Sequence, residues 1–129
     1  MNEFRLYADE HRKYWCLVRL ADTASQMRAD IRRLRRVRVS KEVAGQVTQA
    51  GNADTGGFAV MWLARDELRK RPNELTAHEC AHAALRYVER RGWSYSNAGS
   101  MDDEERICYA LGRMQRRLIM KLYKLGVFA

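Results

Sequence analysis

The chain has 129 residues, and 47% of them are hydrophobic, which allows one domain with one core and argues against general disorder. No apolar run approaches the roughly 20 residues that span a bilayer, and the first residues lack the pattern of a secretory signal. The formal net charge of +8 favours acidic partners such as nucleic acid, although a solvated arginine-rich surface is its commoner cause. We therefore expect a soluble, cytoplasmic protein without membrane contact.

The cysteines support this placement. Cys16, Cys80 and Cys108 are odd in number, and no two of them form a CxxC pair, so reduced thiols are expected. Three cysteines also exclude a structural zinc site built from four. We expect Cys80 and Cys108 to act as small buried hydrophobes.

The first half of the chain predicts strands and one helix. Residues 14–20 are aromatic and apolar and indicate a strand, and residues 23–36 indicate a helix. Residues 37–43 alternate weakly and suggest a short strand. A turn-rich loop at 51–57 precedes a second strong strand at 58–64. The apolar face of the helix is formed by Met27, Ile31 and Leu34.

Two longer helices complete the chain. The first begins near Pro72, with Asn73 as its N-cap, and it runs to about Arg91 before ending at Gly92. Ser100 can cap the second, whose acidic first turn suits the positive end of a helix. Its apolar stripe is formed by Ile107, Leu111, Met114, Leu118 and Leu122. Together the elements predict an α+β fold in a single domain, residues 1–129.

The first of these helices carries the motif HExxH. His78 and His82 lie one helical turn apart on the same face, so both imidazoles can bind one zinc ion. Glu79 projects beside them, where it can take a proton from a zinc-activated water. The spacing therefore predicts two metal ligands and one catalytic base.

A catalytic zinc also needs a third protein ligand. The extended motif HExxHxxGxxH would require glycine and histidine where this chain has Leu85 and Val88, and no histidine follows. A carboxylate on the following helix should therefore complete the site. The candidates are Asp102, Asp103, Glu104 and Glu105.

These residues resemble a known group of enzymes. The sequence HECAHAAL, followed by Glu105-Arg-Ile-Cys-Tyr-Ala-Leu-Gly112, is similar to gluzincin-type zinc metallopeptidases. The closest likeness is to small bacteriophage-encoded HExxH proteins, and a looser one is to the ImmA/IrrE peptidases. The resemblance covers about residues 58–115. It implies a minimal zincin-like domain, in which a small sheet packs against the HExxH helix and the C-terminal helix.

The resemblance and the helical periodicity point to different third ligands. A helical wheel places Glu104 in line with the apolar stripe, toward the core. The spacing in the similar enzymes favours Glu105, with the small Cys108 three positions later and Tyr109 after it. We take Glu105 as the third ligand.

The expected function is that of a zinc-dependent peptidase acting on a protein or peptide substrate. The resemblance further suggests that the strand at 58–64 presents an edge to an extended peptide. The alternative is a non-enzymatic phage-encoded inhibitor or regulator of a host protein that keeps the zinc fold. A nucleic-acid association is also open, through weak contacts of Arg32, Arg33, Arg35 and Arg36.

Overall fold

The fold is α+β, built on one mixed four-stranded sheet. The computed structural model describes residues 2–35, 44–49, 56–93 and 101–128. In order across the sheet the strands are β1 (Asn2–Tyr7), β2 (Trp15–Ala21), β4 (Gly57–Ala64) and β3 (Gln46–Gln49). The central pair β2 and β4 is parallel, and the two outer strands run antiparallel to their neighbours.

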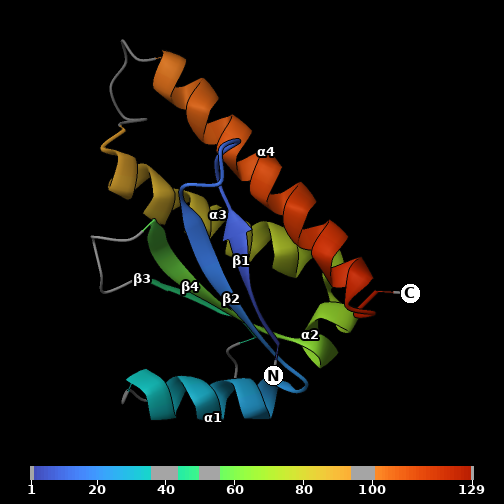
Figure 1. Ribbon diagram of the computed structural model, residues 1–129. Coiled ribbons are helices and arrows are strands. Elements are labelled where there is room, and N and C mark those ends of the chain that lie inside the picture. Colours follow the sequence, from blue (N-terminus) through green and yellow to red (C-terminus); the bar gives the residue numbers. More distant parts are fainter. Residues whose placement is uncertain (1, 36–43, 50–55, 94–100, 129) are drawn as a thin grey trace.

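Helices cover both faces of this sheet (Figure 1). The short α1 (Ala24–Arg35) packs on one face, and α3 (Pro72–Arg91) and α4 (Met101–Lys124) pack on the other. The small α2 (Arg65–Lys70) follows β4 directly and leads into α3. None of the helices in the described ranges is long and apolar enough to cross a membrane.

The burial of the central strands on both faces explains why their sequences are apolar. In β4, Met61 and Leu63 enter the large core under α3 and α4, whereas Trp62 enters the small core under α1. A strand buried on both faces requires a nearly continuous apolar run, and such a run is what predicted this strand from the sequence. The edge strands β1 and β3 have the less apolar sequences NEFRLY and QVTQ, and neither they nor α2 were predicted from the sequence.

Most of the predicted elements are confirmed, including the ends of α3. In the predicted stripe of α4, Met114, Leu118 and Leu122 are buried, whereas Ile107 and Leu111 are only half-buried. Gly92 ends α3 in the left-handed region at φ 67°. Asn73 is not the N-cap, because Pro72, whose fixed φ suits the first helical position, starts the helix after Arg71. The acidic first turn of α4 is confirmed as well.

Three other details were wrong. Leu34 is 49% exposed, because the buried face of α1 ends at Ile31. Cys108 is exposed on α4, whereas Cys80 is buried as expected. The strand β4 presents no edge to a substrate, because it is hydrogen-bonded to β2 on one side and β3 on the other. The predictions for residues 37–43, most of 51–57, Ser100 and Arg36 lie outside the described residues.

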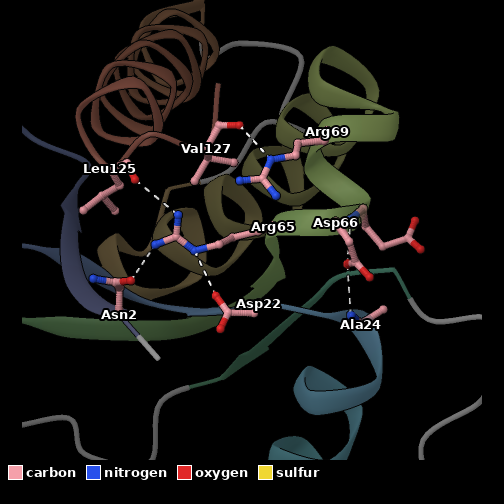
Figure 2. Close-up of polar contacts among 9 residues, drawn as sticks. Asn2, Asp22, Ala24, Arg65, Asp66, Arg69, Leu125 and Val127 are labelled. Carbon is pink, nitrogen blue, oxygen red and sulfur yellow. Dashed lines mark hydrogen bonds and ion pairs between the residues drawn. The ribbon is translucent and has the colours of Figure 1, made fainter. Parts of the chain in front are cut away.

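A polar junction at the start of α2 ties the chain ends to the sheet (Figure 2). Arg65 donates hydrogen bonds to the Asn2 side chain at 2.6 Å and to the carbonyl of Leu125 at 3.2 Å. It also pairs with Asp22 after β2, at 3.3 Å. The neighbouring Asp66 accepts a hydrogen bond from the backbone N–H of Ala24 at 3.0 Å, which satisfies a free donor at the start of α1.

Candidate metal centre

The two histidines of the motif lie together on the exposed face of α3. Their Nε2 atoms are 3.2 Å apart. A tetrahedral zinc with Zn–N distances of 2.0–2.1 Å holds two ring nitrogens about 3.3–3.4 Å apart. The separation also allows one neutral ring to donate a hydrogen bond to the other. The spacing of His78 and His82 is therefore compatible with two ligands of one metal ion and with a hydrogen bond between the two rings.

Glu79 lies beside this pair but is buried. Its side chain enters the packed side of α3, where the residue is 2% exposed. Its Oε1 atom is 3.8 Å from His78 Nε2, and its Oε2 atom has no hydrogen-bond partner among the residues that the structure describes. Burial alone raises the pKa of this carboxyl from 4.5 to about 7. A buried carboxyl with an unpaired oxygen next to two imidazoles is the feature expected of a functional group.

A small pocket of about 160 Å³ opens in front of Glu79. Its walls come from the segment before β3 and from the beginning of α3, and they consist of Ala44, Gly45, Arg71, Glu74, Leu75, His78 and Glu79. Because Gly45 has no side chain, the Glu79 carboxyl can lie against its backbone. A Cβ atom on residue 45 would lie 3.1 Å from both Cγ and Cδ of Glu79 and 3.2 Å from Oε1.

Burial also shifts the pKa values of two groups near Glu79, His82 and Cys80. The pKa of His82 is lowered, first by desolvation and then by His78 and Arg86, and this favours the neutral imidazole that binds metals. The pKa of the Cys80 thiol is raised to about 12, mainly by burial and also by Glu79. Cys80 is therefore a packing residue rather than a thiolate ligand.

The acidic turn of α4 lies away from the histidines. Next to Glu105, Arg106 places its guanidinium 5.7 Å from the ring centre of Trp93, which follows the C-terminal end of α3. That end is nine residues beyond His82, or roughly 13 Å along the helix. Glu104 and Glu105 are both exposed. Within the described part of the chain, no three His, Cys, Asp or Glu side chains form a group that could hold a metal ion.

The structure thus brings together His78, Glu79 and His82 and does not bring Glu105 to them. Ala44, Gly45, Arg71 and Glu74 also line the pocket and were not predicted from the sequence. No local signal identifies Gly45, because the short polar strand that follows it cannot be distinguished from a loop in the sequence. Comparison with known protein families, with curated proteins and with solved structures found no match for this chain.

Proposed function

We propose that the protein is a zinc-dependent hydrolase of peptide bonds, with His78 and His82 as metal ligands and Glu79 as the catalytic base. The observation that carries the proposal is the pair of Nε2 atoms, 3.2 Å apart, beside a buried carboxyl with an unpaired oxygen. Both features fit a zinc ion, because the ring spacing is close to that of tetrahedral coordination and Glu79 Oε2 has no partner in the described part of the chain. Glu105 is the proposed third ligand, and it requires a shift of the start of α4 toward His82.

Each part of the site has a chemical role. His78 and His82 would hold a zinc ion, which would supply Lewis-acid chemistry by polarising a carbonyl and lowering the pKa of a water to about 7. Glu79 would accept the proton from the attacking water and pass it to the leaving amine. The packing around Glu79 holds its carboxyl in one place, because Gly45 and the first turns of α3 surround it. The pocket beside His78 offers room for part of the substrate.

Zinc content of the purified protein tests the metal site. We expect about one zinc per chain, removed by His78→Ala or His82→Ala. His11→Ala is the matched control, since His11 is exposed and lies outside the motif. A wild-type protein that stays free of zinc after zinc is supplied would contradict the proposal.

Glu79→Gln separates an enzyme from a binding protein. The amide keeps the shape of the side chain and cannot accept the proton, so we expect zinc to be retained. Cleavage of a peptide library, followed by mass spectrometry, should fall by about 10²–10⁴-fold. If Glu79→Gln cleaves like the wild type, the glutamate is not the base. If neither protein cleaves any peptide while both bind zinc, the alternative of a non-enzymatic inhibitor or regulator is favoured.

A further inference from the structure

A second feature lies between β1 and α4 and shares no lining residue with the pocket at Glu79. These elements enclose a groove of about 670 Å³. Six cationic side chains line it: Arg5, Arg12, Arg116, Arg117, Lys121 and Lys124. Among the lining residues that the structure describes there is no Asp or Glu. The groove is therefore a concentrated positive surface on a chain whose net charge is already +8.

The cations of α4 are arranged in a row. Arg117, Lys121 and Lys124 follow one another at intervals of three or four residues, so they lie about one turn of roughly 5 Å apart. Arg116 and Lys124 are exposed. A row of this kind can contact successive charges of an extended polyanion.

One arginine of the row, Arg117, also ties α4 to the end of β1. Arg117 donates through Nη1 to the carbonyls of Tyr7 and Asp9, at 2.9 Å each. Its pKa is lowered by burial and then by the nearby charges of Arg113, Arg12 and Arg116, which Asp9 offsets only in part. The arginines therefore repel one another in the free protein, and a bound anion would relieve this repulsion.

Aromatic rings lie among the cations. The Arg12 guanidinium is 6.0 Å from the ring centre of Tyr7, and Lys121 Nζ is 5.6 Å from that of Phe4. Met120 adds an apolar side chain that is 52% exposed. Cationic side chains that follow a backbone, interleaved with aromatic faces, are the features by which proteins bind single-stranded nucleic acid.

We propose that the groove between β1 and α4 binds single-stranded nucleic acid, with phosphates on the α4 cations and bases against the aromatic rings. Its volume of about 670 Å³ is that of a site for a drug-sized ligand, which is room for part of a single strand. This surface differs from the arginine cluster of α1, which packs on the opposite face of the sheet from α4. In that cluster, Arg33 is already paired with Asp30 at 2.9 Å.

The test compares two charge-matched double variants. The groove variant is Arg116→Gln with Lys124→Gln, and the control on α1 is Arg32→Gln with Arg35→Gln; all four positions are exposed on helices. Binding to a labelled oligothymidylate of about 12 nucleotides is measured by fluorescence anisotropy at several salt concentrations. Circular dichroism verifies that both variants are folded.

We expect wild-type binding to weaken about 50-fold between 50 and 200 mM salt, which corresponds to about four phosphate contacts. At 100 mM salt the groove variant should bind the oligothymidylate at least about tenfold more weakly than the wild type. Between 50 and 200 mM salt its affinity should fall only about sevenfold. The α1 control should bind like the wild type.

Four results would overturn the proposal. The first is no binding by the wild type, and the second is an equal loss in both variants, which would indicate net charge alone. The third is a loss confined to the α1 variant, which would place the contact on α1. The fourth is tighter binding of a duplex than of the single strand, which would exclude the proposed occupant. None of these measurements depends on zinc, so the outcome is independent of the proposed peptidase.

Discussion

The burial of Glu79 has a measurable consequence for stability in the metal-free protein. The residue is 2% exposed, its Oε2 atom has no partner within residues 2–35, 44–49, 56–93 and 101–128, and its pKa is raised from 4.5 to about 7. An acid whose pKa is raised on folding binds its proton more tightly in the native state than in the unfolded state. Stability therefore falls as the pH rises from 4.5 to about 7, and the full cost applies above that range.

The size of the effect follows from the shift. One pKa unit corresponds to about 1.4 kcal/mol, so the rise to about 7 costs about 3 kcal/mol at pH 8. Glu79→Gln carries no charge and does not titrate. The free energies of unfolding of the variant and the wild type should therefore differ by only a small constant at pH 4.5. At pH 8 the variant should be more stable by about 3 kcal/mol beyond that constant.

Urea denaturation of both proteins, after treatment with a chelator, measures this difference across the pH range. Subtracting the two curves removes the contributions of other groups, including His82, whose lowered pKa adds stability as the pH rises. A difference that stays constant between pH 4.5 and 8 would refute the reasoning. It would show that water or another partner reaches Glu79 in solution.

Four further predictions concern the site and the fold. Glu105→Ala should reduce zinc content far more than Glu104→Ala, and equal losses would mean that neither is the third ligand. Gly45→Ala should keep zinc but reduce cleavage, because its Cβ atom would lie 3.1 Å from Cγ and Cδ of Glu79 and displace the carboxyl; an unchanged rate would show that the base tolerates movement. Leu118→Ala in the fully buried core should destabilise the protein by about 2–5 kcal/mol in urea, and a loss below 1 kcal/mol would mean that the site is loosely packed. Asp66→Ala removes the acceptor for the Ala24 N–H and should cost about 1 kcal/mol of unfolding free energy in urea. The control Asp22→Ala should cost less, because the Asp22 side chain is 74% exposed.

The sequence alone was sufficient for the features that depend on neighbours along the chain. The separation of four residues between His78 and His82 places both on one helical face whatever the helix packs against. The apolar run at 58–64 indicated a strand, because a strand buried on both faces needs apolar residues throughout. The edge strands β1 and β3 lacked this continuous run. In β1 only Phe4 and Leu6 alternate toward the core, and the four residues of β3 are mostly polar.

Only the tertiary structure decided which groups meet across long separations. The burial of Glu79 depends on Gly45, which is 34 residues earlier in the chain. The position of Glu105 depends on where α4 packs along α3, and a helical wheel contains no information about that offset. The basic groove joins β1 to α4 from opposite ends of the chain. Periodicity reports which face of an element is buried, whereas the partner of that face is set by packing between distant segments.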